Sequence, residues 1–142
     1  MATHRGPRYR RRFVPEPQAA RAARRALEPL VPELSASVLS TVRLLTSELV
    51  TNSILHAGMG GNGLIQMDVD LDAARIRITV RDTGPGFEPP IGLPSPTSQD
   101  GRGIFIVDAL ADRWSIEDSA RTSVWFEIDR QRAERAAVEL AS

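Results

Sequence analysis

The chain has 142 residues, of which 42% are apolar and 25% charged, and these values are typical of a single soluble domain. It contains no cysteine, which excludes a disulfide framework, a thiolate nucleophile and an iron–sulfur site. All 18 basic residues are arginine, so the sequence also excludes a Walker A phosphate loop, a lysine-dependent protein kinase of the eukaryotic type and Schiff-base chemistry.

The basic residues are concentrated at the N-terminal end of the chain. The first 25 residues contain eight arginines and a single acidic residue, Glu16, although the net charge of the whole chain is zero. This arm is compatible with contact to nucleic acid or to an acidic partner, and also with a solvated basic edge, which is the commoner case. We expect residues 1–8 to form a basic tail and residues 9–142 to form one domain.

No stretch of the sequence is apolar enough to cross a membrane. The longest run without a formal charge, residues 49–67, is interrupted by polar residues and four glycines. The arginine-rich N-terminus lacks the apolar segment of a secretory signal. These features predict a cytoplasmic protein.

The N-terminal half is predicted to begin with a strand and two helices. Residues 9–14 favour a short edge strand, and residues 18–30 favour a helix that is ended by Pro29 and Pro32. Ser35 is a suitable N-cap for a long second helix that reaches residue 56. Apolar residues recur along this helix at three- and four-residue spacing, which predicts a core-facing stripe of Val38, Val42, Leu45 and Leu49.

Apolar and polar residues alternate over residues 65–71 and again over residues 75–81, and this pattern predicts a β-hairpin. Aspartates of the first strand and arginines of the second share the polar face. We therefore expect this face to be open to water and the other face to be covered by helices. The predicted fold class is an α/β (α+β) two-layer sandwich, with a mixed, largely antiparallel sheet covered on one face by helices.

The C-terminal half is predicted to begin with an irregular segment, residues 87–100, which contains four prolines and shows no periodicity. Loops of this length are usually functional, and we expect this one to order over a bound ligand. A helix over residues 104–111 should follow, then strands near 114–117 and 122–128, and last an amphipathic helix over residues 130–140.

The long helix carries a row of polar residues, Glu48, Asn52 and His56, each four positions after the one before. Successive helical turns put the side chains of Glu48 and Asn52 about 5–6 Å apart. A carboxylate beside a neutral oxygen donor suits a magnesium site in which Asn52 binds the ion and Glu48 handles a proton. For this helix alone, a solvated glutamate and a helix-end asparagine are the commoner interpretation.

A second group of residues follows the strand that ends near residue 81. Asp82 continues the apolar phase of this strand, and an inward carboxylate is costly unless it is hydrogen-bonded, so it should meet a donor such as the amino group of a base. Gly84 and Gly86 allow a sharp turn and close approach of a ligand. An Asx turn, in which Asp82 bonds its own backbone, explains this residue equally well.

The third group is Gly101, Arg102 and Gly103, directly before the helix predicted from residue 104. Backbone amides at a helix N-terminus bind anions, and the guanidinium of Arg102 suits phosphate oxygens. Taken alone this signal is weak, since glycine is common at helix entries.

In this order, the three groups resemble the nucleotide-binding boxes of the GHKL ATPase superfamily, which includes gyrase, the heat-shock chaperone, histidine kinases and mismatch-repair proteins. The resemblance covers roughly residues 9–129. Four segments look most similar to the small bacterial anti-sigma-factor serine/threonine kinases: SELVTNSILHA, RDTGPGF, GRGIFIV and TSVWFEID.

The resemblance implies a role for each matching residue. Glu48 would be the general base, and Asn52 would hold the Mg²⁺ that bridges the triphosphate of ATP. Asp82 would accept a hydrogen bond from the adenine amino group, and Thr122 would help to recognise adenine. The remaining residues would shape the base pocket or close over the phosphates: Gly84, Gly86, Gly101, Arg102 and Gly103. His56 matches a family position but has no role that we can derive.

The function implied by the resemblance is that of an ATP- and Mg²⁺-dependent serine/threonine kinase that acts as an anti-sigma factor. Such a kinase phosphorylates an anti-sigma-factor antagonist and binds a sigma factor when the antagonist is not available. A homodimer is implied in the same way. The resemblance also puts partner contacts at Arg24 on the first helix, and we expect this helix and the basic N-terminal segment to form part of the sigma-binding face.

The alternative is an ATP-binding interaction module that sequesters a partner without phosphotransfer. Glu48 favours the enzyme, because a pure binding module has no use for a base beside the metal ligand. A nucleic-acid-binding role is the weakest interpretation. It leaves the three groups unexplained, and an aromatic content of 5% provides no stacking platform.

Overall fold

The computed structural model of this protein describes residues 7–56, 63–82, 99–118 and 122–131, and the fold is given for these residues. Their helices and strands are, in chain order, β1 (Tyr9–Phe13), α1 (Ala19–Arg25), the 3-10 turn η1 (Glu28–Leu30), α2 (Ala36–His56), β2 (Ile65–Leu71), β3 (Arg75–Asp82), α3 (Gln99–Leu110), β4 (Arg113–Asp118) and β5 (Thr122–Asp129).

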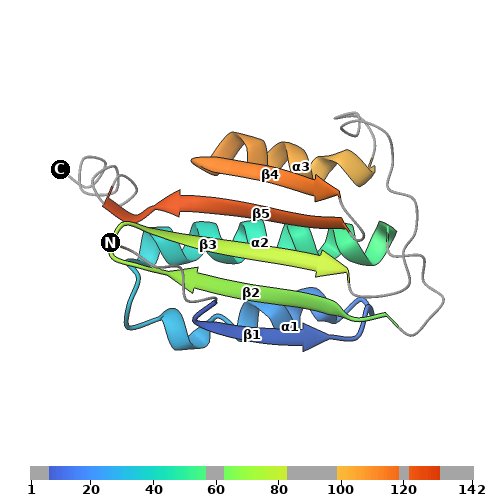
Figure 1. The fold of residues 1–142 in the computed structure, drawn as a ribbon, viewed down its shortest axis with the longest axis horizontal. Helices are drawn as coiled ribbons and strands as arrows, with labels where there is room; N and C mark the ends of the chain where they lie inside the picture. The colour runs from blue at the N-terminus through green and yellow to red at the C-terminus, as the bar shows by residue number, and fades with distance from the viewer. Residues whose placement is uncertain (1–6, 57–62, 83–98, 119–121, 132–142) are drawn as a thin grey trace.

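The strands form one sheet in the order β1-β2-β3-β5-β4, and each of the four pairings is antiparallel. Helices α1, α2 and α3 lie together on one face of this sheet, with α2 behind its middle (Figure 1). The predicted two-layer α/β sandwich is therefore confirmed. Because β5 inserts between β3 and β4, the chain brings the end of β3 next to the start of β5.

The core lies between α2 and the covered face of the sheet. The predicted apolar stripe of α2 is confirmed: Val38, Val42 and Leu45 are fully buried and Leu49 is 1% exposed. Residues from the central strands meet this stripe, and they too are fully buried: Met67, Val69, Ile76, Ile78 and Phe126. Burial of this apolar surface is the main contribution that fixes α2 against the sheet.

Local signals explain where the helices begin and end. The hydroxyl of Ser35 accepts a hydrogen bond from the backbone N–H of Val38 at 3.3 Å, so Ser35 is the N-cap of α2, as predicted. The helix predicted over residues 18–30 is instead two elements, since α1 ends at Arg25 and η1 follows. Pro29 has no N–H to donate to the carbonyl of Arg25, which explains the early end.

The turn that joins β2 to β3 is stabilised by the side chain of Asp72. The carboxylate of Asp72 accepts hydrogen bonds from the backbone N–H groups of Ala74 and Arg75, at 2.8 Å and 2.9 Å. The hydrogen bond from Arg75, and to a smaller extent that from Ala74, holds the pKa of Asp72 below its ordinary value. The turn fixes the hairpin register, in which Asp70 lies opposite Arg77 and Val69 opposite Ile78.

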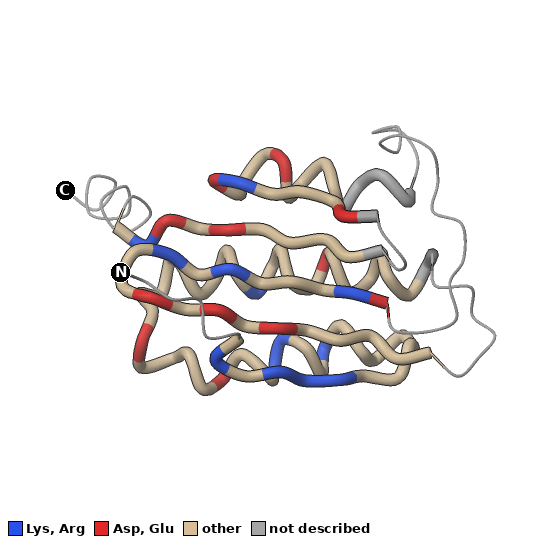
Figure 2. The backbone as a smooth tube through the Cα atoms, in the orientation of Figure 1, with Lys and Arg blue, Asp and Glu red and all other residues tan. Residues whose placement is uncertain are grey.

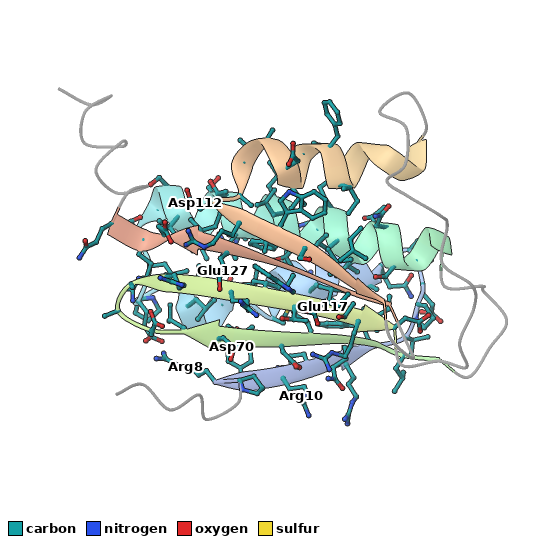
Figure 3. All side chains as sticks on the ribbon, turned by 45° about the horizontal axis from the view of Figure 1, so that its top comes forward. Arg8, Arg10, Asp70, Asp112, Glu117 and Glu127 are labelled. Atoms are coloured by element: carbon teal, nitrogen blue, oxygen red, sulfur yellow. The ribbon has the colours of Figure 1, made fainter. Side chains whose placement is uncertain are left out.

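The face of the sheet away from the helices carries two buried carboxylates that pair with arginines, and one of them is Glu127 (labelled in Figure 3). We call this face the open sheet face. Glu127 accepts hydrogen bonds from Arg113 at 2.7 Å and from Arg77 at 2.9 Å. Asp68 pairs with Arg10 at 2.8 Å and with Arg81 at 3.5 Å. The predicted aspartate–arginine face is thus present, but it extends over all five strands rather than over the hairpin alone.

Two of the predicted segments lie largely outside the described residues. Of the irregular segment predicted over residues 87–100, residues 87–98 lie outside the described residues, whereas residues 99–100 are helical and begin α3. Nearly all of the helix predicted over residues 130–140 also lies outside the described residues. Within the described residues, no helix combines the length and apolar character that a membrane span requires.

Candidate functional site

The segments that carry the predicted site converge at one end of the sandwich. The C-terminal end of α2, the end of β3, the first turns of α3 and the start of β5 all lie at this end (Figure 1). The sheet order accounts for part of this arrangement, because the antiparallel pairing of β3 with β5 places Arg81 opposite Ser123. Packing of α2 against β3 and α3 accounts for the rest.

Glu48 and Asn52 lie one turn apart in α2, and both side chains are half-buried. Their neighbours in the helix, Leu49 and Val50, are buried in the core, so the helix cannot rotate without exposing apolar surface. Glu48 and Asn52 therefore lie beside the apolar stripe of α2, at the edge of the core. A carboxylate and an amide oxygen are held there at a separation that the helix itself fixes.

Asp82 is the last residue of β3 and lies opposite Ile65 at the start of β2. It is 8% exposed, and the preceding inward-facing residue of the strand, Val80, is 1% exposed. The inward position expected for this carboxylate is therefore confirmed. A buried carboxylate at the end of a core strand is suited to accept hydrogen bonds from a neutral polar ligand.

The third group of residues lies in a different setting from the one expected. Helix α3 begins at Gln99, so Gly101, Arg102 and Gly103 are inside its first turns rather than ahead of it. They still occupy the N-terminal end of a helix, where backbone amides are available to an anion. The prediction of the helix start at residue 104 was wrong because glycine is a poor helix former, and tertiary context overrides this weak preference.

The remaining predicted residues are placed only in part. Thr122 is the first residue of β5 and lies opposite Asp118, and His56 is the last residue of α2. Gly84 and Gly86 lie outside the described residues. The structure thus places the elements that carry the predicted residues at one end of the sandwich: Glu48 and Asn52 in α2, Asp82 in β3, Gly101–Gly103 in α3 and Thr122 in β5.

The donor set at this end of the sandwich fits a hard divalent cation bound together with phosphates. Asn52 would offer a neutral amide oxygen to Mg²⁺, and Glu48, one helical turn away, would stay free to take a proton. Among the described residues, no three His, Cys, Asp or Glu side chains gather into a metal site. Mg²⁺ commonly uses one or two protein oxygens and takes its other ligands from water and substrate phosphates, so the residues present suit that mode.

The burial of two polar residues, Thr46 and Glu127, was not predicted from the sequence. Thr46 is fully buried in α2, and its hydroxyl has no hydrogen-bond partner among the described residues. Glu127 is 5% exposed and accepts hydrogen bonds from Arg77 and Arg113 on the face of the sheet away from the helices. For Glu127 a signal was available, because Trp125, Glu127 and Asp129 share one phase of the strand pattern over 122–129.

Most of the chain matches a family model. Residues 13–128 match the model of the histidine kinase-like ATPase domain, which is most of the chain. The chain therefore belongs to the histidine kinase-like ATPase family.

Individual relatives and a solved structure extend the comparison. An anti-sigma F factor of Clostridium botulinum is 29% identical over 115 residues, covering 74% of this chain and 80% of the relative. An uncharacterised protein of Streptomyces coelicolor is 36% identical over 74 residues, covering 50% of this chain and 68% of that protein. The histidine kinase domain of a blue-light-activated kinase from Erythrobacter litoralis superposes with a TM-score of 0.55 at 23% identity.

The superposition supports the fold alone. It covers 70% of this chain but 48% of the Erythrobacter structure, so the chain spans about half the length of that protein. The family match indicates an ATP-binding domain of the kinase/ATPase type.

Proposed function

We propose that this chain is an ATP- and Mg²⁺-dependent protein serine/threonine kinase that acts as an anti-sigma factor and phosphorylates an anti-sigma-factor antagonist. The observation that carries the proposal is that the half-buried Glu48–Asn52 pair belongs to α2 and the buried Asp82 ends β3, two elements whose C-terminal ends lie at the same end of the sandwich (Figure 1). The similarity to anti-sigma F factors of Clostridium and Bacillus supports the choice of partner.

In this proposal, each residue has one task. Asp82 accepts a hydrogen bond from the adenine amino group, and Thr122 at the start of β5 assists this recognition. Asn52 would hold Mg²⁺, and the ion would supply charge neutralisation at the phosphates. The Gly101–Gly103 turn, including Arg102, lies at the N-terminal end of α3 and donates to phosphate oxygens.

Glu48 is the residue that makes the proposed protein an enzyme. Phosphoryl transfer depends mostly on positioning and charge neutralisation, so the distinct chemical task left to the protein is to orient and deprotonate the attacking hydroxyl. Among the described residues assigned to the site, Glu48 is the carboxylate that lies one turn from the metal-binding Asn52. In the proposed step it takes the proton of the serine or threonine hydroxyl as that oxygen bonds to the γ-phosphorus of ATP, while the bond to the β–γ bridging oxygen breaks and ADP leaves.

The partner-binding surface is proposed to include α1. Arg24 lies in the last turn of α1, and its guanidinium donates a hydrogen bond to the hydroxyl of Ser47 in α2 at 2.7 Å. This bond holds the guanidinium at the boundary between the two helices. The resemblance assigns partner contacts to this helix, and it likewise implies a homodimer.

The test is capture of the partner from a lysate of the native organism, followed by incubation of the complex with labelled ATP and Mg²⁺. The proposal predicts that a captured antagonist acquires label on a serine or threonine. Capture of a partner that binds ATP-loaded protein without acquiring label would instead support an ATP-binding module that sequesters its partner.

A further inference from the structure

Basic residues gather on one side of the sandwich, along β1 and the neighbouring α1 (Figure 2). The two elements are in contact, since the hydroxyl of Tyr9 in β1 donates a hydrogen bond to the carbonyl of Ala26 at the end of α1, at 2.7 Å. We call this surface the basic edge. It consists of the exposed residues Arg11, Arg12, Arg21 and Arg25.

The arginines of the basic edge differ from those of the open sheet face in their partners. Arg77 and Arg113 bind the carboxylate of Glu127, and Arg10 binds that of Asp68. In the part of the chain that the structure describes, none of the four basic-edge arginines forms an ion pair.

The two strand arginines of the basic edge are held by neutral groups. The guanidinium of Arg11 donates to the backbone carbonyl of Arg10 at 3.0 Å and lies 4.6 Å from the centroid of the Tyr9 ring. The guanidinium of Arg12 donates to the side-chain oxygen of Gln66 at 3.2 Å. Both cations are thus positioned by contacts that leave their charge uncompensated, and clustered uncompensated charge favours an anionic partner.

Strand β1 is also an end strand of the sheet, because it pairs with β2 on one side and stands first in the strand order. An end strand presents backbone N–H and C=O groups that can pair with a strand of another chain. A strand added here would have its side chains directly across from those of β1, at about 4.5–5.5 Å between Cβ atoms. Arg11 and Arg12 point to opposite faces of the sheet, so the added strand would meet a guanidinium on both faces.

We propose that the basic edge binds an extended, acidic segment of another polypeptide, which adds to the sheet as a sixth strand beside β1. Two like-charged edges repel each other, so a second copy of β1 is not the occupant. The inference deepens the proposed function, on whose partner-binding surface it rests because the two share α1. It involves no residue of the nucleotide site and needs neither ATP nor Mg²⁺.

A polypeptide fits this surface better than a nucleic acid does. The ring of Tyr9 is already covered by Arg11 and its hydroxyl is bonded to Ala26, so the described aromatic side chain at this edge is not open to a stacking base. A phosphate backbone also cannot use the alternating N–H and C=O groups of a strand edge, whereas an extended peptide can use both.

The experiment uses the full chain without nucleotide and a fluorescent ten-residue peptide that alternates glutamate and valine. We expect the peptide to bind, as measured by fluorescence anisotropy, and to slow amide hydrogen exchange in β1. Its affinity should fall about threefold or more in Arg11→Gln/Arg12→Gln, because two charge pairs are lost. Arg21→Gln/Arg25→Gln should weaken binding in the same direction, and circular dichroism identifies any variant that fails to fold.

Two controls separate this surface from general charge attraction. Arg43→Gln removes an arginine of α2 that lies 3.7 Å from Glu28, and it should leave peptide binding unchanged. The same peptide with alternate backbone amides methylated keeps its charge but cannot pair as a strand, and it should bind more weakly. ATP affinity, measured by calorimetry, should be the same in the basic-edge variants and in the wild type, so this inference and the kinase proposal fail independently.

Four results would overturn the proposal. The first is no peptide binding by the wild type, which would leave the arginines as a device against edge-to-edge aggregation. The second is equal binding of the methylated peptide. The third is tighter binding of a single-stranded DNA of equal charge, which would assign the surface to nucleic acid. The fourth is an equal loss of binding in Arg43→Gln.

Discussion

At the scale of single residues, Asp82 is the described side chain that bears most directly on ligand choice. It is 8% exposed and ends β3, where a bound base could reach it from the end of the sandwich. Desolvating a carboxylate is costly unless it is hydrogen-bonded, and in the proposed function the amino group of the base is one of its donors.

Replacing this carboxylate gives the first prediction. Asp82→Ala should weaken ATP binding by about 1–3 kcal/mol, because the amino group of the base is left without an acceptor in a closed pocket. Calorimetry with Mg²⁺ and ATP measures the loss. Asp72→Ala, which removes an exposed carboxylate from the β2–β3 turn, serves as the control and should leave ATP affinity as in the wild type. Unchanged affinity in Asp82→Ala would contradict the adenine assignment.

Glu127 is the second decisive residue, and its role is in stability. Burial alone would raise the pKa of Glu127, but hydrogen bonds from Arg113 and Arg77 outweigh this effect and hold the pKa below its ordinary value. A carboxylate with a lowered pKa in the folded state contributes stability above its pKa in the unfolded chain, and this contribution is lost as the pH falls through the folded-state pKa.

The second prediction follows from that linkage. Glu127→Gln should lower the free energy of unfolding at pH 7 by about 1.5–3 kcal/mol, because charge-assisted hydrogen bonds are lost. The difference from wild type should shrink as the pH falls below the ordinary glutamate pKa of about 4.3. Urea unfolding between pH 7 and pH 3 measures both effects. Glu117→Gln, on the same sheet face, is the matched control. A difference that does not depend on pH would show that the arginine pairing contributes no stability.

At the scale of elements, α2 both builds the core and carries the site. The same helix buries Leu45 and Leu49 and presents Glu48 and Asn52 at its border. In α2, the buried leucines hold the helix against the sheet, and Glu48 and Asn52 are left for the proposed site.

Adjacent leucines of α2 provide the third prediction. Leu45 is fully buried and Leu44 is 42% exposed. Leu45→Ala should lower the free energy of unfolding by about 2–5 kcal/mol, because it removes buried methyl groups and leaves a cavity. Leu44→Ala should change it by no more than about 0.5 kcal/mol. Chemical denaturation of the two variants gives the comparison, and similar losses in both would contradict the assigned orientation of α2.

Elements with strong periodicity could be predicted from the sequence, and those that depend on distant contacts could not. Ser35 and the stripe from Val38 to Leu49 determine α2, and alternation determines the β2–β3 hairpin. The start of α3 was predicted five residues late, because Gly101 and Gly103 lower helix propensity while packing against α2 restores the helix. The residues of the candidate site were predicted from their order along the chain and from the family resemblance, and the convergence of the elements that carry them became visible only in the fold.

At the scale of the whole molecule, the sheet order decides the architecture. The insertion of β5 between β3 and β4 is a pairing between residues about fifty positions apart, such as Arg77 and Glu127. Local patterns carry no information about such pairings, so the order β1-β2-β3-β5-β4 was beyond the sequence analysis. This order also leaves β1 at one end of the sheet, where the basic residues gather.

The central claim is that this fold transfers phosphate and that Glu48 is the base. The most direct measurement is the rate of phosphoryl transfer to the captured antagonist by Glu48→Gln, with ATP affinity measured on the same sample. Transfer should fall by about 10²–10⁴-fold while ATP affinity stays close to that of the wild type, because glutamine keeps the shape of glutamate but cannot accept the proton. Asn52→Ala should impair both binding and transfer, since it removes the metal ligand. Transfer by Glu48→Gln at the wild-type rate would contradict the proposed mechanism.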